Sequence, residues 1–135
     1  VLACDLLVVG ESAKLADTHG KWGMTPTWGM SQRLPRRIGE LRAKQLMFSG
    51  RAVSGREAVA LGLANECVPD AELEARTLAL AREIAANSWF TLRTEKTLLR
   101  GGAGLPPAQA LAYERANSPG AGPDMTERLK SFGKK

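Results

Sequence analysis

The spacing of apolar and polar positions in the first quarter of the chain predicts one short strand and a long loop. Residues 6–9 form a short leucine and valine run that is apolar on both faces and closed by Gly10, which predicts a buried strand. Residues 16–35 are rich in Gly, Pro, Thr and Trp and show no sustained period, so they predict a long ordered loop with at most a short strand near Leu15. Long ordered loops often carry function, which makes this loop the first place to search for a site.

Helical spacing follows the loop. Residues 40–49 place three apolar side chains on one face of a predicted helix, which ends at Gly50. These three are Leu41, Leu46 and Met47. Ser54 and Glu57 form a capping box, in which each side chain binds a backbone N–H that the first turn leaves unpaired, so a second helix starts there and ends before Gly62. Residues 64–68 then predict another short strand.

The last half of the chain predicts helices only. Asp70 is placed to cap a helix that ends near Asn87, and residues 89–99 form the next one. The inward positions of the first are Leu73, Leu80, Ala81 and Ile84. A third helix begins at Pro106 and Pro107 with Leu111 and Ala112 inward, and residues 125–132 form a fourth, capped by Asp124 with Glu127 three residues later.

Composition and charge place the chain among ordinary globular domains with an anionic partner. Its 135 residues suit one domain, and 44% of them are hydrophobic. The net charge of +5 favours an anionic partner, such as a phosphorylated small molecule, a nucleic acid or a membrane surface. Positive charge gathers only at two places, Arg33, Arg36 and Arg37, and Lys130, Lys134 and Lys135. No aromatic residues interleave the first group, which argues against nucleic-acid binding.

Cysteine, histidine and hydropathy patterns limit the remaining classes. Cys4 and Cys67 lie far apart and His19 is the single histidine, so neither a zinc site nor a disulfide framework is predicted. No run of 18 apolar residues occurs and the opening lacks a basic leader, which predicts no membrane segment and a cytoplasmic protein. The chain begins at Val1 inside an apolar run. Two interpretations are open: the terminus is trimmed or disordered, or upstream sequence once covered this apolar edge of the fold.

Several segments together resemble one family. The sequence ACDLLVV at residues 3–9, followed by KLADTHGKWGMTPTWGMSQRLPRRIG at 14–39, is similar to the crotonase pattern of an "ACD" strand, a glycine-containing turn and "QRLPR". The sequence LMFSGRAVSGREAVALGLANECVP at 46–69 resembles a later segment of the same pattern. The chain thus resembles the C-terminal half of the enoyl-CoA hydratase/isomerase (crotonase) superfamily, and the likeness weakens after residue 86.

The resemblance implies an α/β fold, the end of a crotonase-like spiral of ββα units followed by a C-terminal helical trimerisation region. It divides the chain into a partial core at residues 1–69 and a helical oligomerisation region at 70–135. It implies a homo-oligomer, either a trimer or a dimer of trimers. The partner is an acyl-CoA substrate, and no cofactor is expected beyond the coenzyme A that the substrate carries.

The same resemblance suggests site residues. Enoyl thioester hydration needs an oxyanion hole and groups that handle water and the α-proton. In crotonases the oxyanion donors and the first catalytic glutamate precede the "ACD" strand, and the second glutamate falls at His19. An imidazole can act as acid or base near neutral pH, although a lone loop histidine is more often structural. Asp17 is the nearest carboxylate and can orient His19 only if the local backbone is regular.

Further residues are expected at the substrate. The turn before "QRLP" carries an acidic residue in some relatives, whereas here it reads Thr27, Trp28 and Gly29, so Trp28 either narrows the acyl pocket or packs in the core. Lys130 and Phe132 fall where relatives bring a basic and an aromatic residue to the adenine of coenzyme A from a neighbouring subunit. The alternative is that both residues belong to a solvated, frayed C-terminal helix and do not contact the substrate.

Two functions remain open from the sequence. The first is a lyase of the enoyl-CoA hydratase type, acting on acyl-CoA thioesters in fatty-acid or related metabolism, with this chain alone expected to be inactive. The alternative is a non-catalytic crotonase fold that binds acyl-CoA or supports assembly, because His19 stands in the place of the hydratase glutamate.

Overall fold

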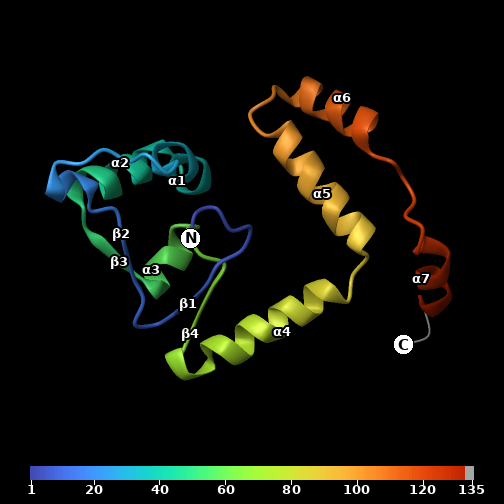
Figure 1. The fold of residues 1–135 in the computed structure, drawn as a ribbon, viewed down its shortest axis with the longest axis horizontal. Coiled ribbons are helices and arrows are strands. Elements are labelled where there is room, and N and C mark those ends of the chain that lie inside the picture. The colour runs from blue at the N-terminus through green and yellow to red at the C-terminus, as the bar shows by residue number, and fades with distance from the viewer. Residues whose placement is uncertain (133–135) are drawn as a thin grey trace. The chain divides into compact units, whose positions relative to one another are not determined.

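The computed structural model describes residues 1–132, and the chain forms two compact units, residues 1–79 and residues from 80 onward (Figure 1). Lys134 and Lys135, two of the predicted positive residues, lie outside the described residues. Within residues 1–132, all strands lie in the first unit, and the second unit contains helices and the loops between them. The functional division predicted after residue 69 stays a prediction.

Two small sheets frame the first unit. Strand β1 (Val8–Gly10) pairs in parallel with β4 (Glu66–Val68), and β2 (Lys14–Ala16) pairs antiparallel with β3 (Ala52–Ser54). The structure confirms the strands predicted near Leu15 and at residues 64–68. It adds β3, a three-residue strand too short for a pattern of period two to reveal.

The first predicted strand begins later than expected. Leu6 is 43% exposed and lies outside β1. Leu7 instead exchanges two hydrogen bonds with Asn65: its N–H donates to Asn65 Oδ1 at 2.8 Å, and its carbonyl accepts the N–H of Asn65 at 2.8 Å. The amide side chain takes the place of a strand neighbour, so the ladder starts at Val8.

The long loop predicted for residues 16–35 is wrong for its last six residues, 30–35. It contains a short 3₁₀ helix, η1 (His19–Trp22), and the start of helix α1 (Met30–Ile38), in which Pro35 lies inside. Proline usually breaks a helix because it lacks an N–H and its ring crowds the preceding turn. Here Met30, Leu34 and Ile38 recur at intervals of four residues, and burial of Leu34 and Ile38 outweighs that cost.

Helices α1, α2 (Glu40–Ser49) and α3 (Gly55–Ala60) build one core with the strands. Its buried members are Val9, Leu34, Ile38, Ala43, Leu46, Val53, Ala58, Leu63 and Ala64. Helix α2 has the predicted bounds, but Leu41 is 84% exposed rather than inward. The buried pair is Ala43 and Leu46, because the small side chain of Ala43 allows close approach of a neighbouring element.

The capping box at α3 is confirmed. Ser54 Oγ accepts the backbone N–H of Glu57 at 3.3 Å. The Glu57 carboxylate pairs with Arg51 at 2.7 Å, which lowers its pKa, and the backbone N–H of Ser54 adds to that effect. The box fixes the entry of the chain into α3 directly after β3.

In the described part of the chain, four helices follow: α4 (Leu73–Ala85), α5 (Trp89–Gly102), α6 (Pro107–Asn117) and α7 (Met125–Ser131). They agree with the predicted series, except that the three residues at 70–72 form a 3₁₀ turn, η2 (Asp70–Glu72). Two predicted caps are wrong: neither Asp70 nor Asp124 makes a side-chain cap bond. The carboxylate of Asp70 accepts the N–H of Ser12 instead, at 3.2 Å.

Helices α5 and α6 lie side by side in the second unit (Figure 1). The predicted inward residues Leu111 and Ala112 are exposed, and Leu111 is 55% exposed. The contact is made instead where Tyr113 of α6 lies against Gly101 of α5, so close that a Cβ on Gly101 would lie 2.1 Å from the Tyr113 hydroxyl. The bulk of Tyr113 and the absence of a side chain at Gly101 set which face of α6 turns inward.

Candidate functional site

Of the cavities in the first unit, two adjoin each other. The larger of these two, about 330 Å³, is walled mainly by apolar side chains, with Lys14, Asp17 and Arg51 as its charged lining residues. The smaller, about 220 Å³, is lined by His19 and by residues of the segment that leads into α1. The two share Val1, Leu2 and Met30 as lining residues. An apolar hollow with a few polar groups at its edge is the usual form of a small-molecule site.

Asp17 and His19 form a side-chain pair at this place. Asp17 is buried, with its side chain 3% exposed, and its Oδ1 atom contacts Nδ1 of His19. The same oxygen accepts the backbone N–H of His19 at 3.1 Å. The imidazole is 25% exposed and lines the smaller cavity. An imidazole held by a carboxylate at a cavity wall has the arrangement of an acid–base group.

The local backbone explains why the two side chains meet. Strand β2 ends at Ala16, paired with Ala52, and η1 begins at His19. Between them, the carboxylate of Asp17 bonds the N–H two residues onward, which is the hydrogen bond of an Asx turn. The side chains therefore meet because the chain turns, whereas the sequence argument had required a regular extended backbone.

The predicted acyl-site turn lies at the same cavity in part. Trp28 lines the smaller cavity and is 89% exposed, so it does not pack in the core formed by the described residues. Gly29 has φ +87°, a left-handed conformation that favours glycine, and starts α1. Thr27 is exposed and does not line either cavity.

Sequence reasoning missed Arg33 as a site residue and counted it only as part of a positive group. It lines the smaller cavity with His19 and Trp28, one helical turn after Gly29. A Cβ at Gly29 would lie 3.0 Å from Arg33 Nε, so the glycine leaves room for the guanidinium. Recognition of α1 from the spacing of its apolar residues could have placed Arg33 there.

Lys130 and Phe132 belong to α7 and its end in the second unit. Lys130 lines a shallow hollow with Asp124, Glu127, Arg128 and Ser131, and Phe132 is 87% exposed. Lys130 thus lines a hollow of the second unit, whereas His19 and Trp28 line the smaller cavity of the first unit.

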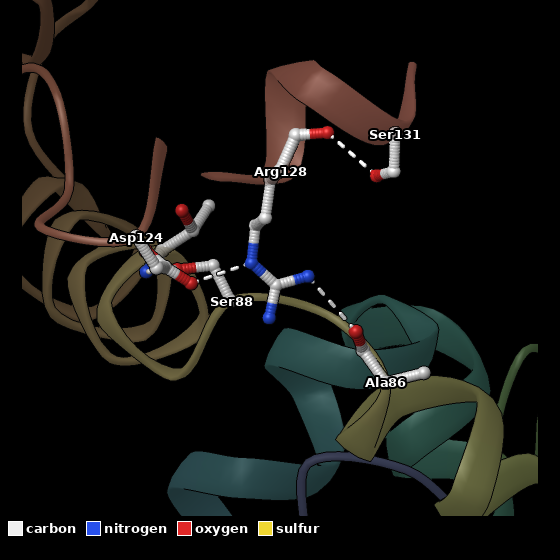
Figure 2. A network of polar contacts seen from close by, with 6 residues as sticks. Ala86, Ser88, Asp124, Arg128 and Ser131 are labelled. Carbon is white, nitrogen blue, oxygen red and sulfur yellow. Dashed lines mark hydrogen bonds and ion pairs between the residues drawn. The ribbon is translucent and has the colours of Figure 1, made fainter. Parts of the chain in front are cut away.

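A polar network holds α7 in place within the second unit (Figure 2). Asp124 accepts the hydroxyl of Ser88 at 2.8 Å and pairs with Arg128, which lowers the pKa of Asp124. Arg128 also donates to the carbonyl of Ala86 at 2.9 Å. The network ties the first turn of α7 to the junction of α4 and α5, and Ser88 also caps α5.

The described residues contain neither a metal-binding cluster nor a membrane-spanning helix. Within residues 1–132, no group of three or more His, Cys, Asp and Glu side chains is placed to hold a metal ion. Cys4 is exposed and Cys67 half-buried, and both are free thiols. None of the helices described here has the length and apolar character needed to cross a membrane.

Comparison with known proteins decides the family. The family model described as enoyl-CoA hydratase/isomerase matches residues 1–124. This chain belongs to that family. A putative enoyl-CoA hydratase of Thermus thermophilus is 44% identical over 98 residues, which is 73% of this chain and 38% of that protein. The human methylglutaconyl-CoA hydratase, a mitochondrial protein, is 37% identical over 120 residues, or 85% of this chain and 35% of that one.

Solved structures of family members agree. A crystal structure of enoyl-CoA hydratase from Bacillus anthracis superposes with a TM-score of 0.93 at 35% identity, over 98% of this chain and 52% of that one. The resemblance predicted from the sequence, and the helix-rich α/β crotonase-like fold, are therefore confirmed. The chain spans about half the length of this solved relative and less than half of the curated ones. The roles of His19 and of the substrate residues stay predictions.

Proposed function

We propose that this chain supplies part of the acyl-CoA site of an enoyl-CoA hydratase and that His19 transfers a proton there. The observation that carries the proposal is the Asp17–His19 pair at the wall of a cavity, in a chain whose family model matches residues 1–124. Three relatives are named enoyl-CoA or methylglutaconyl-CoA hydratases, which supports hydration as the reaction.

The chemistry is the addition of one water to a conjugated thioester. The water oxygen bonds to the β-carbon while the imidazole of His19 accepts a proton from it. The α-carbon then takes up a proton, so the double bond is lost and the imidazole returns to its neutral form. Preorganised N–H donors to the thioester oxygen are also required, since charge develops there during the reaction.

The substrate is proposed to lie along the smaller cavity, with Trp28 against the acyl group and with Thr27 and Gly29 in the turn that carries Trp28. Arg33 adds a positive charge at this wall, in keeping with the anionic character of coenzyme A esters. Lys130 and Phe132 are proposed to bind the nucleotide end, since a basic and an aromatic side chain suit a phosphorylated adenine. No cofactor is proposed beyond the coenzyme A of the substrate.

We also propose that the chain corresponds to the C-terminal half of the family fold and that its helical region forms a homo-oligomer, a trimer or a dimer of trimers. The support is exposed apolar surface: Leu99 of α5 is 76% exposed, and Leu98, Leu99 and Leu111 line one groove between α5 and α6. The cytoplasm stays the predicted compartment, although curated relatives include peroxisomal and mitochondrial proteins.

The test is hydration of a short enoyl-CoA by the native polypeptide that contains these residues, followed by mass spectrometry of the hydroxyacyl-CoA product. We expect His19→Ala to lower kcat by about 10²- to 10⁴-fold, the usual contribution of a general acid or base. Glu74→Gln removes an exposed carboxylate of α4 and serves as the control with unchanged kcat. Binding of the ester without any product would overturn the hydratase proposal in favour of an acyl-CoA-binding module.

A further inference from the structure

We propose that Asp17 is a positioning residue, which holds His19 as the Nδ1–H tautomer and leaves Nε2 to act on the ligand in the smaller cavity. This inference rests on the proposed function in one respect, that His19 transfers a proton. It goes further because two residues of this chain together take the role that one catalytic glutamate has in the hydratase pattern. Of these two, the buried Asp17 does not contact the substrate.

The side chain of Asp17 is more deeply buried than that of His19, as expected if Asp17 holds the ring and His19 contacts the ligand. The Asp17 side chain is 3% exposed, whereas the His19 side chain is 25% exposed and lines the smaller cavity. Asp17 lines the larger cavity instead, together with Lys14 and Arg51, and is absent from the lining of the smaller one. A ligand in the smaller cavity therefore meets the imidazole, and the carboxylate lies behind it.

The carboxylate is itself held in place. Its Oδ1 atom accepts the backbone N–H of His19 at 3.1 Å as well as contacting Nδ1. The first bond belongs to the turn between β2 and η1, so the acid cannot rotate away without breaking the turn. Beyond the turn, Gly50 has φ +59°, and a Cβ there would lie 3.4 Å from the carbonyl of Asp17 and 2.8 Å from Lys21 Cε. The end of α2 thus packs closely against the turn that carries the pair.

This geometry determines which ring nitrogen carries the proton. An ionised carboxylate only accepts hydrogen bonds, so a neutral imidazole bound to it through Nδ1 must carry its proton on Nδ1. Nε2 then presents a lone pair, and it makes no hydrogen bond with any side chain or backbone group of residues 1–132. When Nε2 takes up a proton, the adjacent negative charge of Asp17 stabilises the imidazolium, which is the role of the aspartate in Ser-His-Asp triads.

The tautomer can be measured directly because His19 is the single histidine of the chain. Long-range ¹H–¹⁵N correlation spectra of the ¹⁵N-labelled protein distinguish a protonated from an unprotonated ring nitrogen. At a pH where the ring is neutral, we expect the Nδ1–H form to dominate, whereas free histidine carries its proton mainly on Nε2. A dominant Nε2–H form in the unmodified protein would overturn the inference.

Two variants separate positioning from a merely structural role. Asp17→Ala should shift the tautomer ratio toward Nε2–H by about tenfold or more, since one tautomer loses a hydrogen bond to a charged group. Asp17→Asn keeps the shape and should lower kcat by about 10²-fold or more with little change in KM, because the charge that stabilises the imidazolium is lost. Glu74→Gln is the control for both, and the backbone amide spectrum checks that each variant is folded.

The outcomes distinguish this inference from the proposed function. An Nδ1–H tautomer that depends on Asp17, in a protein that hydrates no enoyl-CoA, would support the positioning role and reject the hydratase. Hydration that proceeds unchanged in Asp17→Asn, together with a tautomer that Asp17→Ala does not alter, would reject the positioning role and leave the hydratase standing.

Discussion

Replacing Gly55 by alanine should destabilise the first unit, because at this residue α3 lies directly against the β1–β4 sheet. A Cβ at Gly55 would lie 2.4 Å from the carbonyl oxygen of Gly10 and 2.9 Å from Cys67 Sγ. The first contact is with backbone that is held in the β1–β4 ladder, so it cannot give way as the end of a flexible side chain could. Relief requires α3 to move away from the sheet.

The expected loss follows from two opposing terms. Overpacking of a well-filled core costs about 1–3 kcal/mol. Alanine also reduces the entropy of the unfolded chain relative to glycine, which returns about 0.4–1 kcal/mol. The difference of the two ranges is about 0–2.6 kcal/mol, with a centre of about 1.3 kcal/mol of destabilisation. Each kcal/mol lowers Tm by about 4–8 °C in a unit of roughly 60–100 residues.

Thermal and urea unfolding followed by circular dichroism provide the measurement. The matched control is Gly20→Ala in the same unit, where the added Cβ would lie 3.7 Å from the carbonyl of Met47, an ordinary contact. We expect this control to be as stable as the unmodified protein or slightly more so. A Gly55→Ala protein that unfolds at or above the temperature of the unmodified protein would refute the reasoning from close approach.

Two further predictions concern pH and assembly. The pKa of Glu66 is lowered from its ordinary value of 4.5 by its hydrogen bonds and charge interaction with Arg76. The Glu66–Arg76 pair therefore stabilises the fold above pH 4.5, and this stabilisation is lost as the pH falls through the lowered pKa of Glu66. Glu66→Gln should therefore reduce the unfolding free energy at pH 7 and leave it nearly unchanged at the most acidic pH, as measured by urea titration across the acid range; an equal loss at both pH values would contradict the assignment. If the α5–α6 groove assembles copies of the chain, Leu99→Arg should shift the mass measured by light scattering toward that of the monomer. The control Gln109→Arg adds the same charge on α6 and should leave the mass unchanged. Identical masses in both variants would argue against this groove as the interface.

The sequence predicted helices correctly where neighbouring residues all indicate the same structure. The bounds of α2, and the start of α3 at the Ser54–Glu57 box, follow from residues within one or two turns of each other. Helix α1 was missed because two local rules conflict in it. Glycine and Pro35 indicate a loop, while the four-residue spacing of Met30, Leu34 and Ile38 indicates a helix, and only burial against the rest of the core decides between them.

Side-chain partners were harder to predict than elements. Asp70 and Asp124 have the sequence context of helix caps, yet their carboxylates bind Ser12 in one case and Ser88 with Arg128 in the other. Ser12 is 58 residues from Asp70, and Ser88 is 36 residues from Asp124. A short acidic side chain takes the nearest donor in space, and sequence separation says little about which donor that is.

By itself, the sequence determined the family, because the order and spacing of its motifs resemble one group of proteins and the family model matches residues 1–124. It also pointed to His19 through its place in that pattern. Only the tertiary structure decided that Asp17 binds the ring of His19, that Trp28 and Arg33 share a cavity wall with it, and that Leu111 faces outward. Motif spacing follows the order of residues along the chain, whereas these contacts depend on how the β2–η1 turn, α1 and α6 pack in space.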